Sequence, residues 1–404
     1  MTEQVNTPEL RFPEFNEEWR EFNLKDISTK KSKKNKNKLY NETFTNSAEY
    51  GIVSQKDYFD KEISNVRNLS NYYIVDPDDF VYNPRISRLA PVGPINRNKL
   101  NRIGVMSPLY TVFSTKLPIK SFLEYYFKTT KWHKFMKLNG DSGARSDRFT
   151  IKQSLFVKMP IVLPSEQEQE KIGYFFSKLD RQIELEEKKL ELLEQQKRGY
   201  MQKIFSQELR FKDDSGNSYP DWSIKKIEDI SKVNKGFTPN TKNDEYWDEL
   251  NENWLSIAGM TQKYLYKGNK GITEKGALKH VKVDKDTLIM SFKLTLGKLA
   301  IVKETIYTNE AICHFVWKES NVNTEYMYYY LNSINISTFG AQAVKGVTLN
   351  NDSINSIIVK LPVIQEQNKI AYFFNELDKL IRKQHAKIEV LKQRKKGLLQ
   401  KMFI

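Results

Sequence analysis

The sequence predicts an α+β protein with a pseudo-two-fold internal repeat, in which two globular regions are separated by two long α-helices that form an antiparallel coiled coil. Two observations carry this prediction. One stretch of sequence recurs at a constant offset, and both copies carry a helical pattern of apolar residues. The length agrees, because 404 residues at about 150 per domain correspond to roughly two to three domains.

The repeat is the strongest feature of the sequence. Residues 163–180 and 361–378 align at an offset of 198, and 12 of these 18 positions are identical. The segment Glu-Leu-Arg-Phe also occurs twice, at 9–12 and 208–211. We therefore expect a globular region at each of 1–164 and 207–364, and a helix at each of 165–206 and 365–404.

The order of these segments is cyclic, because the second Glu-Leu-Arg-Phe segment directly follows the first repeated tail. We expect the two ends of the chain to lie close together. A circular permutation near residue 207 is then expected to be tolerated.

Each repeated tail has the pattern of one long helix. No proline occurs from Ser165 to Tyr219 or after Pro362, and Ser165 with Glu168 forms a capping-box start. About 40 residues correspond to a helix of about 60 Å. Gly199 and Gly397 lie within the predicted helices at a cost of about 1 kcal/mol each, which indicates a close crossing or a kink.

The apolar residues of both tails recur at spacings of three and four, which is a heptad pattern. A stripe only two positions in seven wide favours pairing of two helices over the alternative, a helix buried in a globular core. Polar residues interrupt the stripe at Glu186, Lys197, Gln384 and Lys395. The residues expected at the coiled-coil interface are Phe176, Leu179, Ile183, Leu190, Leu193, Phe374, Leu377, Ile381, Ile388 and Leu391.

The charges of the two tails indicate which helices pair. Residues 165–206 carry 8 basic and 9 acidic residues, whereas residues 365–404 carry 10 basic and 4 acidic residues. An acidic and a basic helix complement each other across a coiled coil, so we expect the two tails to pair within one chain. A two-fold relation between the repeats makes that pair antiparallel, with Lys197 and Lys395 setting its register.

The globular regions differ from each other. Residues 8–163 and 207–361 share almost no sequence between their edges, and each mixes strand-like runs with helical stretches such as 119–138 and 325–334. Two units of similar organisation whose variable regions have unrelated sequences indicate that each unit recognises a different target.

Charge suggests that the partner is a nucleic acid. The chain carries a net charge of +15, and residues 1–164 hold 27 basic and 18 acidic residues against 20 and 19 in residues 207–364. Residues 29–38 form a polybasic segment, which we expect to be flexible and to contact phosphates; a solvated charge run or a disordered loop is the alternative. Its candidate DNA-binding residues are Lys30, Lys31, Lys33, Lys34, Lys36 and Lys38.

A second candidate is the glycine-bracketed loop 140–148, with Ser142, Arg145 and Arg148. Arginine can read guanine through two hydrogen bonds in the major groove. The corresponding loop 340–346 keeps the glycines and one cation, Lys345.

The composition excludes several classes of protein. The 39% hydrophobic and 12% aromatic content is too high for a disordered chain, and no apolar run is long enough for a membrane span. The N-terminus lacks the apolar core of a signal peptide. The single cysteine, Cys313, excludes an internal disulfide and fits a reducing cytoplasm, where we expect the protein.

Catalytic motifs are missing from the sequence. The four histidines have no metal-ligand spacing, and there is neither a P-loop nor a Gly-x-Gly-x-x-Gly turn. Asn83-Pro-Arg85 lacks the second proline and the aromatic residue of an adenine methyltransferase signature. We expect that this chain holds no metal or cofactor and catalyses nothing itself.

The repeated tails resemble those of the specificity subunits of type I restriction–modification enzymes. The shared features are a Leu-Pro start, Glu-Gln, Lys-Ile, a Phe-Phe pair and Leu-Asp, together with the variable region before each tail. Lys235-Gly-Phe-Thr-Pro239, Tyr246-Trp247 and Trp254–Ala258 resemble a recurrent pattern of target recognition domains, which makes Thr238 a further candidate for DNA contact. The first variable region lacks that pattern.

The resemblance implies a function. Each target recognition domain would read one half of a bipartite, asymmetric DNA site, and the helix pair would set the spacer and dock two modification subunits. Those subunits would bring S-adenosylmethionine and methylate adenine at N6, and restriction subunits would add ATP- and Mg-dependent translocation and cleavage. Two alternatives remain: a coiled-coil scaffold that binds only proteins, and a self-sufficient DNA-modifying enzyme.

Overall fold

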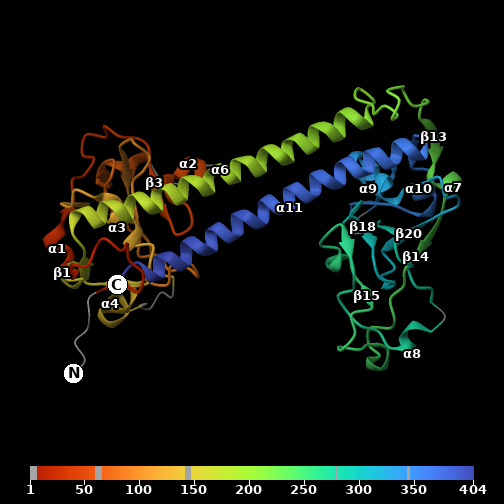
Figure 1. The fold of residues 1–404 in the computed structure, drawn as a ribbon. Coiled ribbons are helices and arrows are strands. Elements are labelled where there is room, and N and C mark those ends of the chain that lie inside the picture. Colours follow the sequence, from red (N-terminus) through yellow and green to blue (C-terminus); the bar gives the residue numbers. More distant parts are fainter. Residues whose placement is uncertain (1–6, 60–65, 142–146, 279, 294, 344–345) are drawn as a thin grey trace. The chain divides into compact units, whose positions relative to one another are not determined.

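The computed structural model describes residues 7–59, 66–141, 147–278, 280–293, 295–343 and 346–404 (Figure 1). The chain forms two compact units. Unit 1 comprises Met1–Glu187 with Ala386–Ile404, and unit 2 comprises Lys188–His385. Two long helices, α6 (Glu166–Phe205) and α11 (Ile364–Lys401), each contribute residues to both units.

Unit 1 is built on a four-stranded antiparallel sheet. The strand order is β2-β9-β6-β7. Its strands are β2 (Ser28–Lys31), β9 (Thr111–Thr115), β6 (Phe80–Tyr82) and β7 (Ile95–Arg97). The two central strands, β6 and β9, carry buried apolar side chains. The rings of Phe80 in β6 and Phe113 in β9 stack with their centroids 5.6 Å apart.

Shorter elements complete unit 1. The antiparallel strand pairs are β1 (Arg20–Asn23) with β12 (Pro160–Leu163), β3 (Phe44–Ser47) with β4 (Gly51–Ser54), β5 (Tyr73–Val75) with β8 (Gly104–Met106), and β10 (Gly140–Asp141) with β11 (Thr150–Ile151). The helices are α1 (Leu24–Ile27), α2 (Gln55–Phe59), the 3₁₀ turn Val66–Asn71, α3 (Lys120–Tyr126), α4 (His133–Asn139) and α5 (Gln153–Phe156).

Unit 2 repeats the same sheet on different residues. Its strand order is β14-β20-β17-β18, again antiparallel throughout, with β16 added in parallel at the β18 edge. These strands are β14 (Ser231–Lys235), β20 (Ile312–Trp317), β17 (Leu288–Ser291), β18 (Leu299–Val302) and β16 (Tyr264–Leu265). The internal repeat is therefore present in the fold of the globular parts, where the sequence does not show it.

The remaining elements of unit 2 also follow the pattern of unit 1. An antiparallel strand pair, β13 (Ser223–Lys226) with β23 (Ile358–Leu361), precedes α11 as β1 with β12 precedes α6. The others are α7 (Ile227–Ile230), β15 (Trp254–Leu255) with β19 (Tyr307–Thr308), α8 (Glu274–Ala277), α9 (Thr324–Ser333), β21 (Ala341–Ala343) with β22 (Gly346–Thr348), α10 (Asn351–Asn355), and the 3₁₀ turns Asp244–Tyr246, Ile257–Gly259 and Ile336–Phe339.

The ends of the long helices belong to the globular cores. In unit 1, Phe176 of α6 and Phe403, just beyond α11, are buried with their ring centroids 5.9 Å apart. In unit 2, Phe374 of α11 and Phe205 of α6 repeat this contact at 5.8 Å. The apolar stripe thus serves both purposes considered from the sequence: its ends pack into the cores, and the segments between them pair as helices.

Two local expectations are wrong. The stretch 119–138 is not one helix, because the chain turns between Tyr126 and His133 and forms α3 and α4. Gly199 and Gly397 mark no close crossing within the described residues, since a Cβ atom added at either position would meet nothing within 4 Å. Both lie inside unbroken helices.

Candidate nucleic-acid interface

The predicted polybasic segment 29–38 begins within strand β2, and its residues 32–38 lie in the loop after that strand, which we name the β2 loop. Asn35 is buried, and its side chain donates a hydrogen bond to the Tyr40 carbonyl at 2.7 Å and accepts one from the Tyr40 amide at 3.2 Å. The Asn35 amide donates to the carbonyl of Tyr72 at 3.0 Å. The buried Asn35 thus links this loop to Tyr40 and Tyr72. The exposed lysines of the loop are Lys33, Lys34, Lys36 and Lys38.

Lys30 and Lys31, at the end of β2, have different surroundings. Lys31 forms ion pairs with Asp76 at 2.6 Å and Asp79 at 3.4 Å, so its charge is already compensated. Lys30 is exposed and has no ion pair among the described residues, and the same holds for the four exposed lysines of the loop. Five of the six predicted lysines are therefore available to phosphates.

The glycine-bracketed loop is only partly described. Ser142 and Arg145 lie outside the described residues, whereas Arg148 is half-buried and forms an antiparallel bridge with Arg85. Two backbone hydrogen bonds flank this bridge, from Ile86 to Asp147 at 2.9 Å and from Phe149 to Pro84 at 2.7 Å. Arg85 was not predicted as a DNA contact, because it is far from Arg148 along the chain and the sequence does not show that the two residues lie opposite each other.

The pairing of Arg85 with Arg148 places two positive residues directly opposite each other, which is unfavourable without an anionic partner. Neither arginine has an ion pair with a described residue. Arg148 lines a surface hollow together with residues that include Tyr82, Thr111 and Phe149. Guanidinium groups donate hydrogen bonds to acceptors such as phosphate oxygens and the O6 and N7 atoms of guanine.

Unit 2 joins the corresponding segments in the same way. The Leu349 amide donates to the Phe292 carbonyl at 3.3 Å, as Phe149 does to Pro84 in unit 1. Around Phe292 lie two exposed lysines that were not predicted as DNA contacts, Lys235 and Lys293, with ammonium groups 4.7 Å and 5.7 Å from the ring centroid. These lysines occupy the part of unit 2 that corresponds to the arginine bridge.

The two residues predicted for unit 2 have different outcomes. Lys345 lies outside the described residues. Thr238 is half-buried, and its hydroxyl accepts a hydrogen bond from Asn309 at 2.8 Å and donates one to the carboxylate of Glu310. The acidic neighbour makes this position less favourable for a phosphate.

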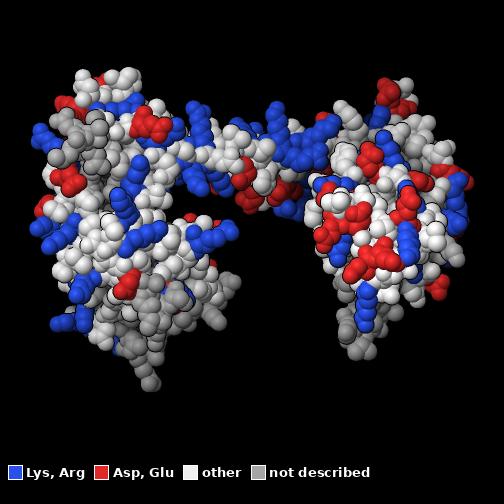
Figure 2. Space-filling view, turned by 90° about the horizontal axis from the view of Figure 1, so that it is seen from below, with Lys and Arg blue, Asp and Glu red and all other residues white. Residues whose placement is uncertain are grey.

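The two units differ in surface charge, and unit 2 is the more acidic one, as the composition predicts. On the face shown in Figure 2, acidic side chains are more numerous over the unit on the right, which contains β13, than over the unit on the left. The contrast agrees with the larger basic excess of residues 1–164 over residues 207–364.

The apolar residues predicted for the helix interface are shielded from solvent to different degrees. Those that are buried are Phe176, Ile183, Phe374 and Ile388. Those that are half-buried are Leu179, Leu190, Leu193, Leu377, Ile381 and Leu391.

The polar interruptions of the stripe form contacts between the helices. In unit 1, Lys395 pairs with Asp180, and Lys387 pairs with Glu186 at 2.5 Å. In unit 2, Lys197 pairs with Asp378 at 2.6 Å. Since residue numbers rise along α6 as they fall along α11, the helices are antiparallel within unit 1.

The helices are also antiparallel within unit 2. Lys197 contacts Asp378, and Tyr200, which is further along α6, packs edge-on against Phe373, which is earlier in α11, with ring centroids 5.1 Å apart. Lys392 adds a further pair to Glu187 at 2.8 Å in unit 1. The basic helix thus meets acidic residues of its partner, as the charges of the two tails predict.

Metal and membrane sites are not found in the part of the chain that the structure describes. No group of three or more His, Cys, Asp or Glu residues there is arranged to hold a metal ion. No described helix combines the length and apolarity that a membrane span requires.

Comparison with known proteins identifies relatives of this chain. Two curated relatives come from Methanocaldococcus jannaschii. The type I restriction enzyme MjaIX specificity subunit is 30% identical over 210 residues, which are 50% of this chain and 48% of that protein. The MjaVIII specificity subunit is 22% identical over 320 residues, 73% of this chain and 70% of that protein. The alignment with the first relative thus spans about half of its length.

Solved structures show the same fold. One such structure comes from a study of complex assembly and conformational transition of the type I R-M system. It superposes on this chain with a TM-score of 0.63 at 12% identity, over 95% of this chain and 97% of that chain. The S subunit of a type I system from M. genitalium gives a TM-score of 0.53 at 13% identity, over 98% and 99%.

A family model extends the relationship to both halves of the chain. The model of the type I restriction modification DNA specificity domain matches residues 16–195 and 219–393. Each match contains one sheet, its flanking strand pair and most of the long helix that follows. The protein therefore belongs to the type I restriction–modification DNA specificity family.

Proposed function

We propose that this chain is the sequence-specific DNA-binding subunit of a type I restriction–modification complex. The observation that carries the proposal is the repeated sheet, whose order and strand directions are the same in both units although the sequences share almost nothing. One framework that carries two unrelated loop surfaces suits the reading of two different DNA half-sites.

Residues 1–164 and 207–364 would act as target recognition domains, each reading one half of a bipartite, asymmetric site. In the first, the exposed lysines of the β2 loop supply phosphate contacts, which position the domain without reading sequence. Arg85 and Arg148, with Ser142 and Arg145 of the same loop, are the candidates for base contacts. In the second domain, Lys235 and Lys293 are the corresponding candidates, and Lys345 and Thr238 are further candidates on the sequence alone.

The helices within residues 165–206 and 365–404 would set the unread spacer and dock two modification subunits. A rigid pair of helices suits this task, because half-sites read from one face of DNA lie about one helical turn apart. The modification subunits would supply S-adenosylmethionine and adenine-N6 methylation, and restriction subunits would supply ATP- and Mg-dependent cleavage. This chain contributes recognition and assembly, and no catalytic step.

The test is coexpression with modification subunits, followed by sequencing of methylated adenines. A bipartite motif is expected, and exchange of residues 8–163 for those of a relative should alter one half of it. A continuous motif, or a change in both halves, would contradict the assignment of one domain to each half.

The same preparation separates the two alternative functions. A scaffold that binds only proteins would show no salt-sensitive DNA binding by the assembled complex. A self-sufficient enzyme would transfer methyl groups as the purified chain alone.

A further inference from the structure

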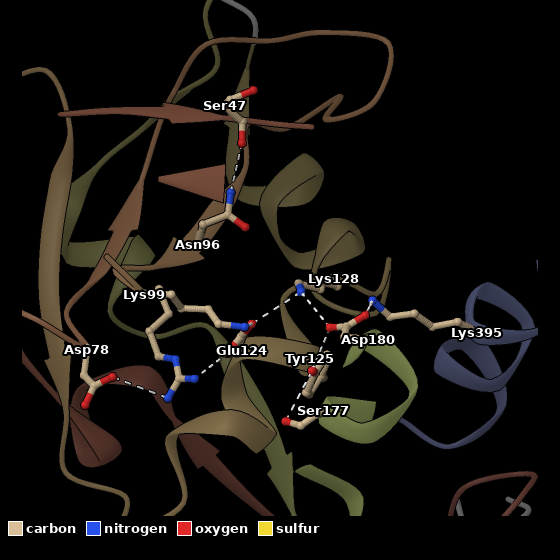
Figure 3. Close-up of polar contacts among 11 residues, drawn as sticks. Ser47, Asp78, Asn96, Lys99, Glu124, Tyr125, Lys128, Ser177, Asp180 and Lys395 are labelled. Carbon is tan, nitrogen blue, oxygen red and sulfur yellow. Dashed lines mark hydrogen bonds and ion pairs between the residues drawn. The ribbon is translucent and has the colours of Figure 1, made fainter. Parts of the chain in front are cut away.

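Three side chains from three separate elements meet in unit 1. They are Tyr125 of α3, Asp180 of α6 and Lys395 of α11, and we name them clasp 1 (Figure 3). The Tyr125 hydroxyl donates to the Asp180 carboxylate at 2.8 Å, and Lys395 pairs with the same carboxylate. The Lys395 ammonium also lies 5.6 Å from the centroid of the Tyr125 ring. Each member therefore contacts both of the others.

Unit 2 contains the same arrangement, which we name clasp 2. Tyr329 of α9 donates to Asp378 of α11 at 2.6 Å, and Lys197 of α6 pairs with Asp378 at 2.6 Å. Lys197 lies 5.6 Å from the centroid of the Tyr329 ring. In each clasp the carboxylate comes from the helix that leaves the globular part, and the lysine comes from the other helix.

The origin of these residues is informative. The aspartates and lysines belong to the repeated tails, and each pair is related by the offset of 198. Tyr125 and Tyr329 lie in the regions that share almost no sequence. Even so, the hydroxyl of each tyrosine donates a hydrogen bond to the aspartate of the repeated tail in its own unit. Packing alone would not require a hydroxyl at this position, because phenylalanine fills nearly the same volume. The contact between globular part and helix pair is thus retained where the surrounding sequence is not.

In unit 1, charged contacts extend from clasp 1 into the sheet. Lys128 lies 3.8 Å from Asp180 and 3.4 Å from Glu124, a carboxylate that is only 4% exposed (Figure 3). Glu124 pairs with Arg97 of strand β7 at 2.7 Å. Strand β7 pairs with β6, and the segment joining these two strands carries Arg85. A continuous series of ion pairs therefore joins the helix pair to the sheet that presents the arginine bridge.

We propose that clasps 1 and 2 are positioning contacts that fix the rotation of each recognition domain on the helix pair and thereby restrict the spacer to one length. The proposal rests on the proposed function. One base pair corresponds to about 35° of rotation and about 3.4 Å of translation along DNA. A domain that can turn by this angle accepts a spacer one base pair longer or shorter, whereas a domain held by a clasp does not.

The test uses the complete chain coexpressed with modification subunits, with spacer length read from the methylated sites. Tyr125→Phe removes the charge-assisted hydrogen bond to Asp180 and a longer contact of 3.4 Å with the Ser177 hydroxyl, and it keeps the ring. The matched control is Tyr126→Phe on the same helix, since the Tyr126 hydroxyl donates to the carbonyl of Pro160 within the globular part and not to a helix. Lys395→Arg keeps the charge of clasp 1 and serves as the conservative variant, and Tyr329→Phe tests clasp 2.

The ratio of sites with spacers one base pair off to sites with the original spacer is expected to rise about tenfold in Tyr125→Phe, as for removal of one hydrogen bond to a charged group. The rise in Tyr329→Phe should be at least as large, because the Tyr329 hydroxyl also accepts a hydrogen bond from Lys263 at 2.8 Å and contacts Asn375 at 2.9 Å. Tyr126→Phe and Lys395→Arg should keep the original distribution, and both half-sites should stay unchanged in every variant. A purely structural role would lower methylation at all sites without changing this ratio, and that result would overturn the proposal. Absence of any bipartite motif with the unmodified chain would instead overturn the proposed function, and the clasp proposal with it.

Discussion

The backbone amide of Leu10 donates a hydrogen bond of 2.9 Å to the carbonyl of Lys401, and the amide of Leu209 donates one of 3.0 Å to the carbonyl of Lys203. These are equivalent contacts in the two units. Between Lys203 and Leu209 the chain is continuous, whereas Leu10 and Lys401 lie far apart in sequence. The contact therefore forms whether or not a short segment of chain joins its two residues directly, as the cyclic order of the segments predicts.

A circular permutant follows from this relationship. Joining the present ends through a short linker and opening the chain between Ser206 and Gln207 should give a folded protein that supports the same methylation motif. Gln207 has a φ of +67°, so opening the chain there also removes a strained residue. Opening α6 between Leu192 and Leu193 is the control, and it should abolish cooperative thermal unfolding. Equal behaviour of the two permutants would contradict the prediction.

Alanine at Gly199 or Gly397 should stabilise the protein. Both glycines lie inside long helices, and an added Cβ would meet nothing within 4 Å. Each substitution should therefore raise the free energy of unfolding by about 1 kcal/mol through helix propensity. Gly173→Ala in α6 is the control, because its Cβ would lie 2.2 Å from the Ser121 hydroxyl. Chemical denaturation of the isolated chain distinguishes them, and destabilisation by Gly199→Ala would show that the prediction is wrong.

The β2 loop should control DNA affinity without controlling sequence. We consider the five predicted lysines that have no ion pair with a described residue. Replacing them with glutamine should weaken DNA binding and reduce the steepness of log K against log salt by about 0.9 for each phosphate that is no longer neutralised. These lysines are Lys30, Lys33, Lys34, Lys36 and Lys38. Binding measured across a salt series checks this, and the methylated motif should stay the same. An unchanged salt slope would contradict the assignment.

Arg148 should behave in the opposite way. Arg148→Ala is expected to cost about 1–3 kcal/mol of discrimination at one base pair of the half-site read by unit 1. Arg85→Ala should relax the same or an adjacent position, because the two residues form one bridge. The methylated motif measures both effects. Uniform weakening at all sites with no relaxed position would assign these arginines to phosphate contact instead.

Acid should weaken clasp 1. Burial acts to raise the pKa of Asp180, but the hydrogen bond and charge of Lys395, the charge of Lys128 and the hydrogen bond from Tyr125 together outweigh it. The pKa of Asp180 therefore lies below its ordinary value of 3.8. The folded state thus binds this proton less tightly than the unfolded chain. The stabilisation is fully present above about pH 4 and is lost as the pH falls through the lower folded pKa.

Thermal unfolding between about pH 6 and pH 3 tests this prediction with Asp180→Asn as the comparison. The difference in Tm between the unmodified chain and the variant should be constant above about pH 4 and should shrink below it. Asp57→Asn is a useful control because that carboxylate is exposed and lies outside both clasps. A Tm difference independent of pH would show that the carboxylate charge of Asp180 does not contribute.

Much of the architecture could be predicted from residues close together in sequence. The long helices were expected at 165–206 and 365–404, and they extend over Glu166–Phe205 and Ile364–Lys401. Heptad spacing, the absence of proline and the capping residues are local signals, so they are visible in a single sequence. The opposite charges of the tails also predicted the pairs that Lys387 and Lys395 form with α6.

The candidate site was predicted less completely. The exposed lysines of the β2 loop lie close together in sequence, so they could be chosen as candidates, but the hydrogen bonds of the buried Asn35 within the loop could not be predicted. Arg85 was missed because its bridge to Arg148 depends on how a sheet loop and a distant hairpin pack. The paired tyrosines at 125–126 and 329–330 were a usable signal for the clasps, since they recur before both tails.

The sequence by itself determined the repeat, the two long helices, their charge and the basic excess of the first globular part. Only the tertiary structure decided the common strand order of the two sheets, the arginine bridge and the placement of Tyr125 and Tyr329 on the repeated aspartates. The physical reason is that helices follow from interactions three or four residues apart, whereas sheet order and side-chain clusters depend on which distant segments bury their apolar faces together.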